Sequence, residues 1–378
     1  MANNSRIQKL KLTNYRNHEK LLIECKKNFI FLEGKNGSGK TNVLEAISLI
    51  SSRSGFRNSE FNMVVSKKNK VSPEQFGANF RLESSSDIID IGIGLKKQGE
   101  TLQRITKVDG SNSTMNLDDI MKVFWILPTM NSIFVGPSKE RRVFYDHMIS
   151  LFANKHKKMI KEYNNLQQER IKILKLYSLT ENNLKWLDML EKKMSTLGIL
   201  ITENRISFIE NMNDILSNEN DHLPGLKINL FSGMSEKYNK LSALDLEEEF
   251  VIDLFKSRET DTKTGKTNIS AIKSDFTVFH KSNKLFDKDC STGEQKIILF
   301  SIIMSFIKLL KKKGEKNIIF LLDDIFSTLD SNYTDILLFS LNDLNVQTWL
   351  TDVKGNVIHQ NHLLYKETMF INIEDINI

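Results

Sequence analysis

The clearest chemistry in the chain belongs to a glycine-rich octapeptide, made of Gly34, Lys35, Asn36, Gly37, Ser38, Gly39, Lys40 and Thr41. Glycines allow backbone N–H groups to converge on phosphate oxygens, and the N-terminus of a following helix adds positive potential. In such a loop the lysine, here Lys40, reaches the β- and γ-phosphates, while the Thr41 hydroxyl is placed to hold Mg²⁺. The octapeptide predicts a binding site for a nucleoside triphosphate.

The elements on either side of this loop fit that prediction. Residues 28–33 form an apolar run that indicates a buried strand, and residues 42–50 carry apolar side chains at helical spacing. A strand, a glycine loop and a helix in this order are the context that a phosphate-binding P-loop requires.

A second group of candidate residues lies near the C-terminus. The apolar run 317–322 predicts a strand that ends in Asp323 and Asp324. At a nucleotide site such a strand places the first carboxylate near Mg²⁺ and the second beside the γ-phosphate. Asp330 follows at the spacing of the loop known as the D-loop. Taken alone, the pattern also fits a buried strand whose end is marked by acidic residues.

A third motif, Ser-Thr-Gly-Glu-Gln-Lys at residues 291–296, precedes a strongly apolar stretch at 297–310. Ser291 and Glu294 have the spacing of a capping box, and the basic residues 311–313 followed by Gly314 are typical of a helix end. By itself this segment favours a structural role over a functional one.

Composition narrows the class of protein. The chain has 378 residues, 40% of them hydrophobic, and 53 Lys and Arg against 47 Asp and Glu give a net charge of +6. Cys25 and Cys290 fit neither a disulfide framework nor a metal site, so Mg²⁺ held with the nucleotide is the only metal expected. No run of 18 apolar residues and no secretory signal is visible, and we therefore expect a cytoplasmic protein without a membrane partner.

The rest of the chain suggests three parts. Alternating residues at 7–15, 20–25, 86–95 and 101–108 predict a small antiparallel β layer beside the nucleotide fold. Amphipathic spacing between 139 and 216 predicts two antiparallel helices, the second about 50 Å long. The polar segment 258–268 carries almost nothing to bury and predicts a mobile loop. The expected parts are residues 1–138 and 286–378, the two halves of the nucleotide-binding head, and residues 139–285, a helical arm.

Together, the glycine loop, the Ser-x-Gly-Glu segment and the Asp-Asp pair resemble an ABC-type ATPase head, an α/β fold with a mixed sheet and flanking helices. In that family two heads pair head-to-tail, and the Ser/Gly loop of each caps the γ-phosphate held by the other. The resemblance implies that Ser291 and Gly293 act on the ATP of a second subunit. It also implies that Asp330 lies at the dimer seam and that Asp324 sits where a general base would polarise water.

Four further segments resemble the RecF family of recombination-mediator ATPases, namely residues 7–17, 34–47, 54–57 and 136–146. The resemblance implies a DNA-repair protein that binds ATP and Mg²⁺ and forms an ATP-dependent homodimer. It would engage single-stranded or gapped DNA with a RecR-type partner and support recombinase loading. Slow, DNA-stimulated ATP hydrolysis would serve to release the dimer from DNA.

The chain departs from the family pattern at two places. Thr129 and Met130 stand where acidic residues usually follow the strand ending in Pro128. Asp352 occupies the position at which transporter ATPases carry a switch histidine, which fits weak turnover. For DNA contacts and the adenine pocket the sequence offers only candidates: Arg53, Arg57, Arg141, Arg142 and the Lys155–Lys161 cluster for DNA, and residues 15–17 for adenine.

Three other functions share parts of this pattern. A chromosome-structuring ATPase of the SMC type needs much longer coiled-coil arms, and a transporter ATPase needs a coupling surface and usually the switch histidine. A structural clamp that binds ATP without meaningful hydrolysis differs from the main interpretation only in degree and stays open at this point.

Overall fold

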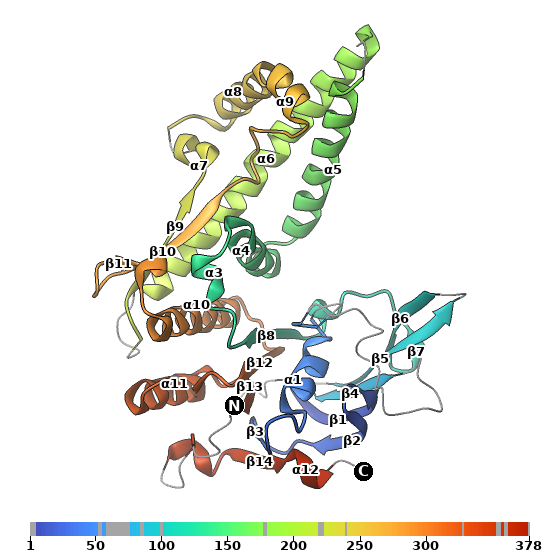
Figure 1. Ribbon diagram of the computed structural model, residues 1–378, viewed down its shortest axis with the longest axis vertical. Coiled ribbons are helices and arrows are strands. Elements are labelled where there is room, and N and C mark those ends of the chain that lie inside the picture. Colours follow the sequence, from blue (N-terminus) through green and yellow to red (C-terminus); the bar gives the residue numbers. More distant parts are fainter. Residues whose placement is uncertain are drawn as a thin grey trace. The chain divides into compact units, whose positions relative to one another are not determined.

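The structure is a computed structural model that describes residues 5–51, 55–57, 76–83, 87–98, 101–176, 180–217, 223–238, 240–326, 329–352, 357–358 and 362–376. Arg53 and Ser54 lie outside the described residues. The chain forms two compact units, whose elements are labelled in Figure 1. The first holds residues 1–130, 220–223 and 299–378, and the second holds residues 131–219 and 224–298.

A parallel five-stranded sheet is the centre of the first unit. Its order is β14 (Thr368–Asn372), β3 (Phe29–Glu33), β13 (Gln347–Thr351), β12 (Ile318–Asp323) and β8 (Lys122–Ile126), and all neighbouring pairs are parallel. Every residue of β12 and β13 is buried, as expected for strands covered on both faces. The strand predicted before the Asp-Asp pair is confirmed, and the C-terminal tail contributes the edge strand β14.

Helices cover this sheet. Helix α1 (Lys40–Ser48) contacts β8, β12 and β13. Helix α10 (Thr292–Lys312) begins in the second unit and continues into the first, where Phe300 and Phe306 pack against Phe320 and Phe124 of the sheet. Other helical elements described in the first unit are α11 (Ser331–Leu344), α12 (Ile373–Ile376), η1 (Leu117–Asp119) and η5 (Leu363–Tyr365).

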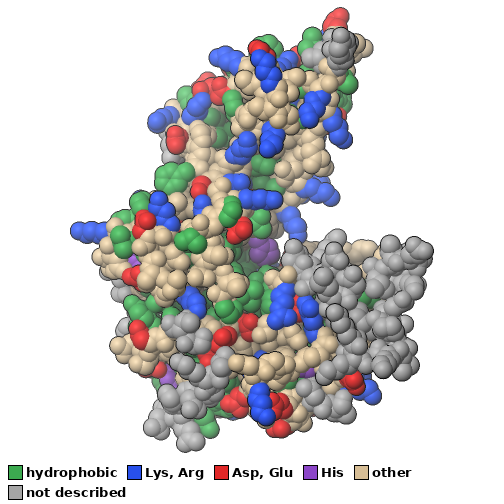
Figure 2. All heavy atoms as spheres, in the orientation of Figure 1, with side chains coloured by type: hydrophobic (Ala, Val, Ile, Leu, Met, Phe, Trp, Pro, Cys, Tyr) green, Lys and Arg blue, Asp and Glu red, His purple; other side chains and the backbone are tan. Residues whose placement is uncertain are grey.

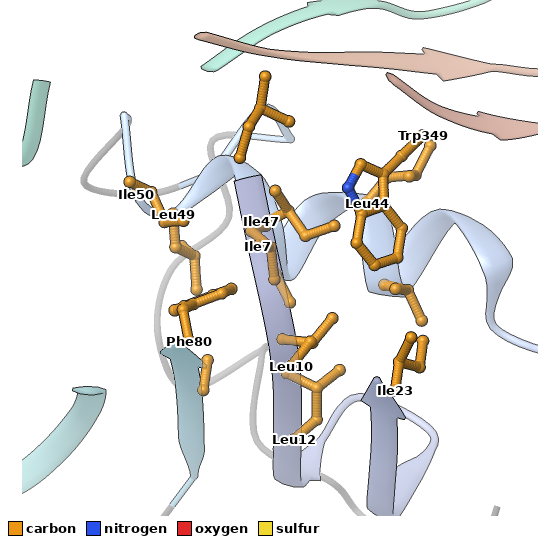
Figure 3. Close-up of a cluster of buried hydrophobic side chains, with 14 of the residues drawn as sticks. Ile7, Leu10, Leu12, Ile23, Leu44, Ile47, Leu49, Ile50, Phe80 and Trp349 are labelled. Atoms are coloured by element: carbon orange, nitrogen blue, oxygen red, sulfur yellow. The ribbon is translucent and has the colours of Figure 1, made fainter. Parts of the chain in front are cut away.

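A six-stranded antiparallel sheet forms the second layer of this unit. Its order is β2 (His18–Glu24), β1 (Arg6–Tyr15), β4 (Gly77–Glu83), β5 (Ile88–Gln98), β6 (Thr101–Val108) and β7 (Ser111–Asn112). The predicted strands are confirmed, but the layer is larger than expected, and parallel and antiparallel pairs are segregated into separate sheets. Buried Leu10 and Leu12 of β1 join Leu44 and Ile47 of α1 in one hydrophobic core, which extends to Trp349 (Figure 3).

Long helices dominate the second unit, as predicted. Helix α5 (His156–Leu174) packs along α6 (Glu181–Leu216), whose 36 residues span about 54 Å. A capping box between Thr180 and Asn183 starts α6. Also present are α3 (Ser132–Val135), α4 (Ser138–Phe152), α7 (Gly233–Tyr238), α8 (Ala243–Lys256), η3 (Asp287–Asp289) and an unpredicted sheet of β9 (Leu226–Phe231), β10 (Asp275–His280) and β11 (Leu285–Phe286).

The expectation of a mobile loop at 258–268 is wrong. Residues Arg258–Thr264 form helix α9, and the side chain of Asp261 is fully buried. Arg170 of α5 donates to Asp261 Oδ2 at 2.6 Å and to Glu191 Oε1 at 2.8 Å, and Arg258 also binds Glu191. The segment is ordered by a buried ion-pair network rather than by apolar side chains. Its lack of apolar residues therefore gave the wrong prediction.

Among the described helices, none combines the length and the apolar character needed to cross a membrane.

Candidate functional site

The glycine loop has the backbone that its sequence predicts. Gly34, Gly37 and Gly39 have φ angles of 141°, 85° and 107°, which L side chains rarely adopt. At Gly39 space adds a second restriction, because a Cβ atom would lie 2.4 Å from His18 Nε2 and 2.6 Å from the Asn17 side chain. Gly39, directly before α1, therefore has to be a glycine.

The turn between β1 and β2 supports the loop. Asn17 Nδ2 donates to the Ser38 carbonyl at 2.9 Å, and Asn42 Nδ2 donates to Asn17 Oδ1 at 2.7 Å. Of the adenine candidates at residues 15–17, Tyr15 is excluded, because its ring is fully buried and offers no surface to a base. The role that the structure gives to the turn is to hold the loop in shape.

Lys40 and Thr41 open helix α1 at the carboxyl end of β3. Lys40 is 8% exposed, and its Nζ donates to the carbonyls of Gly34 at 2.5 Å and Lys35 at 3.2 Å. The Thr41 hydroxyl donates to Asp323 Oδ1 at 2.8 Å, so two residues far apart in the sequence meet at one point.

Asp323 lies at the carboxyl end of β12 and accepts a second hydrogen bond, from the Thr351 hydroxyl at 2.7 Å. Burial raises the pKa of Asp323 above its ordinary value, while the hydrogen bonds from Thr351 and Thr41 oppose that rise. Asp324 follows with φ 46°, and its N–H donates to the Thr351 carbonyl at 3.1 Å. Thr351 was missed by sequence reasoning, although it ends the strand beside β12 at the same sheet edge.

These residues surround a pocket of about 270 Å³. It is lined by Lys35, Asn36, Gly37, Gly39, Lys40, Thr41, Asn42, Arg57, Asp323, Asp324, Thr351 and Asp352. Arg57, a candidate for DNA contact, donates instead to Asn42 Oδ1 at 2.8 Å beside the pocket. Three cationic side chains, a glycine loop and three carboxylates around one pocket suit a phosphate chain with a bound cation.

The donor set fits Mg²⁺. The Thr41 hydroxyl and the Asp323 carboxylate are adjacent oxygens, and Mg²⁺ in nucleotide sites is held by one or two such groups together with substrate phosphates. A different kind of metal site, made of three or more His, Cys, Asp or Glu side chains, is absent from the described residues.

Ser291, Gly293 and Asp330 are placed differently. Ser291 and Gly293 belong to the second unit and are not among the described residues that line the pocket. The predicted capping box is present, since Ser291 N–H donates to Glu294 Oε2 at 2.7 Å and Glu294 N–H donates to Ser291 Oγ at 3.3 Å. Asp330 caps helix α11 by accepting from Tyr333 N–H at 2.9 Å. Within one chain, Ser291 and Asp330 therefore have structural roles as helix caps.

Two arginines that the sequence offered for DNA contact are engaged inside the second unit. Arg141 binds Asp275 through two hydrogen bonds of 2.7 and 2.8 Å and also donates to the Gly136 carbonyl. Arg142 donates to the Ser274 carbonyl at 2.7 Å. Their guanidinium groups connect the loop before α4 to the start of β10.

Comparison with known proteins identifies the family. The model of the RecF/RecN/SMC N-terminal domain matches residues 6–372. The DNA replication and repair protein RecF of Rickettsia prowazekii (strain Madrid E) is 32% identical over 346 residues, which cover 91% of this chain and 93% of that protein. This chain belongs to the RecF family. RecF of Rickettsia bellii (strain OSU 85-389) is 31% identical over 352 residues, covering 92% of this chain and 95% of that protein.

Solved structures show the same fold. A structure of the recombination mediator protein RecF-ATP in the RecFOR pathway matches with a TM-score of 0.79 at 21% identity, covering 98% of both chains. An SMC head domain from Pyrococcus furiosus matches with a TM-score of 0.51 at 15% identity, covering 93% of this chain and 92% of that one. The predicted α/β ABC-type head is confirmed by these RecF and SMC likenesses.

Proposed function

We propose that this protein binds ATP with Mg²⁺ and acts in DNA repair at single-strand gaps or junctions. The observation that carries the proposal is the meeting of Lys40, Thr41 and Asp323 in one pocket beside the glycine loop. The relatives that are named DNA replication and repair proteins support the biological setting. A cytoplasmic location and a RecR-type partner belong to the same proposal, and the RecFOR pathway of the structural relative supports them.

ATP is proposed to act as the switch for a homodimer. Ser291 and Gly293 stand at the open start of α10, where a Cβ atom on Gly293 would meet nothing within 4 Å. A helix N-terminus with a hydroxyl and free space suits the γ-phosphate of a second subunit. In the dimer, Ser291 would bind that phosphate, and Asp330 would lie along the seam.

Slow hydrolysis would release the dimer from gapped DNA after the recombinase has been loaded. Bound Mg²⁺ would neutralise phosphate charge, and Thr41 and Asp323 would hold it. Asp324 lines the same pocket and would orient water as a general base. DNA would stimulate this turnover by favouring the dimer.

Nucleotide titration with a fluorescent ATP analogue tests the proposal. Lys40→Met removes the phosphate-binding cation, so we expect at least a tenfold loss of affinity for ATP·Mg²⁺. Asp324→Asn should keep wild-type affinity and lose turnover. Wild-type affinity in Lys40→Met would contradict the proposed site, and equal turnover in Asp324→Asn and wild type would favour a clamp without meaningful hydrolysis.

A further inference from the structure

One row of residues crosses the open face of the antiparallel sheet in register. Lys11 of β1 pairs with Asn79 of β4, Asn79 pairs with Gly92 of β5, and Gly92 pairs with Lys107 of β6. The residues on either side of them along β1, β4 and β5 are buried, so this row points away from the core. With strands about 4.8 Å apart, the Cα atoms of the two lysines are about 14 Å apart.

Gly92 floors the space between the two lysines, and two more glycines lie in the neighbouring row. Gly92 lies in the row itself, and Gly77 and Gly94 face each other in the next pair on the same face. Glycine weakens a strand interior and often marks a place where a ligand or another backbone approaches closely. These three glycines therefore need an explanation other than strand stability.

Local geometry explains Gly94 but not Gly92. A Cβ atom on Gly94 would lie 3.0 Å from the Phe76 carbonyl, so the backbone there requires a small residue. At Gly92 it would lie 3.2 Å from Asn79 Oδ1 and 3.8 Å from Lys107 Cβ, both in exposed side chains that can shift. Its φ is outside the left-handed region, so any residue could adopt the conformation.

The hollow above Gly92 is lined by more positive than negative side chains. It measures about 430 Å³ and is lined by Lys9, Lys11, Asn79, Arg81, Asp90, Gly92 and Lys107, among others. Lys9 is paired with Glu24, and Arg81 is paired with Asp90. Within the part of the chain that the structure describes, neither Lys11 nor Lys107 forms an ion pair. The two cations at the ends of the row are available to an anion.

We propose that this face, the glycine trough, binds the sugar-phosphate backbone of a nucleic acid. Lys11 and Lys107 neutralise phosphates on either side, and the Asn79 amide donates to a phosphate oxygen. Gly92 allows the nucleic-acid strand to approach the sheet. A narrow trough with cations at both edges fits a charged polymer better than a compact ligand. The identity of the polymer rests on the proposed function.

Two kinds of variant test the trough with labelled gapped DNA over a salt series. Gly92→Val fills the floor with a residue that favours strands, so we expect a Tm equal to or above wild type with weaker DNA binding. Lys11→Gln with Lys107→Gln should weaken binding and reduce the slope of log affinity against log salt by about 1 per lysine. Lys192→Gln with Lys256→Gln removes two exposed charges from the second unit and is the matched control.

The outcomes separate this inference from the proposed function. Wild-type binding and slope in the Lys11/Lys107 pair would overturn the trough while leaving the proposed function intact. A lower Tm in Gly92→Val with unchanged DNA affinity would show that the glycine serves the sheet alone. If wild-type protein binds ATP but no DNA in any nucleotide state, both the trough and the proposed role in DNA repair are overturned.

Discussion

Asp323 accepts hydrogen bonds on one oxygen from two hydroxyls, Thr41 in the glycine loop and Thr351 at the end of β13. The first hydroxyl is a candidate Mg²⁺ ligand, whereas the second only orients the carboxylate. Loss of a partner that orients a metal ligand typically costs about 10- to 100-fold in metal affinity or activity. The site is therefore larger than the motifs that predict it.

Replacing Thr351 with valine removes this orienting hydrogen bond at nearly constant volume. We expect the Mg²⁺ concentration that half-saturates ATP-analogue binding to rise about 10- to 100-fold. Binding of the same analogue without Mg²⁺ should stay close to wild type, and this comparison separates metal affinity from a damaged fold. An unchanged Mg²⁺ midpoint would remove Thr351 from the site.

At this scale the sequence predicted most of the pocket, because the glycine loop and the Asp-Asp pair are contiguous motifs. Thr351 and Arg57 could not be assigned in the same way, since they reach the pocket only through strand order and a turn. Arg141 and Arg142 are the opposite case, because they are conspicuous in the sequence but their partners in the fold are not. Their charge suggested DNA, but their partners Asp275 and Ser274 come from more than 100 residues further along the chain.

At the scale of elements, packing of α6 depends on one small residue. Gly198 lies inside this helix, and a Cβ atom there would be 2.7 Å from Ala271 Cβ. Gly198→Ala adds about 1 kcal/mol of helix propensity, but the overpacking costs about 1–3 kcal/mol. Urea unfolding should show a net loss of stability.

A second variant distinguishes overpacking from other causes. Ala271→Gly makes room on the facing segment, so the double variant should recover stability relative to Gly198→Ala alone. If the two effects simply add, the contact between Gly198 and Ala271 does not explain the loss.

Helix α5 begins with an unfavourable concentration of positive charge. Three exposed lysines, Lys155, Lys157 and Lys158, lie at its N-terminus, where the helix dipole is already positive. The first turn, all of whose residues the structure describes, has no acidic residue. Figure 2 shows Lys and Arg side chains exposed over α5. An anion at this end would relieve the repulsion, and the phosphates of DNA are the anions that we expect.

Changing these three lysines to glutamine should weaken DNA binding and reduce its salt slope. Removing unfavourable charge from the helix end should leave the Tm at or above wild type. Filter binding over a salt titration measures both affinity and slope. Unchanged binding throughout the titration would exclude this end of α5 as a DNA contact.

Elements were predicted where side-chain periodicity is strong and missed where burial is polar. The long helices and the β1–β2 and β5–β6 hairpins follow apolar spacing and were found. Helix α9 is anchored by the buried Arg170–Asp261 ion pair. No apolar pattern signals a helix of this kind, whereas the unpredicted strand β9 does alternate apolar with polar residues.

For the whole molecule, the distribution of the motifs between units is the central observation. The glycine loop and Asp323 belong to the first unit, whereas Ser291 and Gly293 begin α10 in the second. If the γ-phosphate is bound by the glycine loop of one chain and by Ser291 and Gly293 of another, two copies of the chain are required. We therefore expect that ATP, rather than protein concentration alone, determines the oligomeric state.

Sedimentation velocity of the Asp324→Asn variant with ATP, with ADP and without nucleotide tests this most directly. Because this variant should retain ATP, we expect a dimer with ATP and a monomer in the other two conditions. Labelled gapped duplex should sediment with the dimer. A monomer under all three conditions, at protein and ATP concentrations that saturate the pocket, would contradict the account.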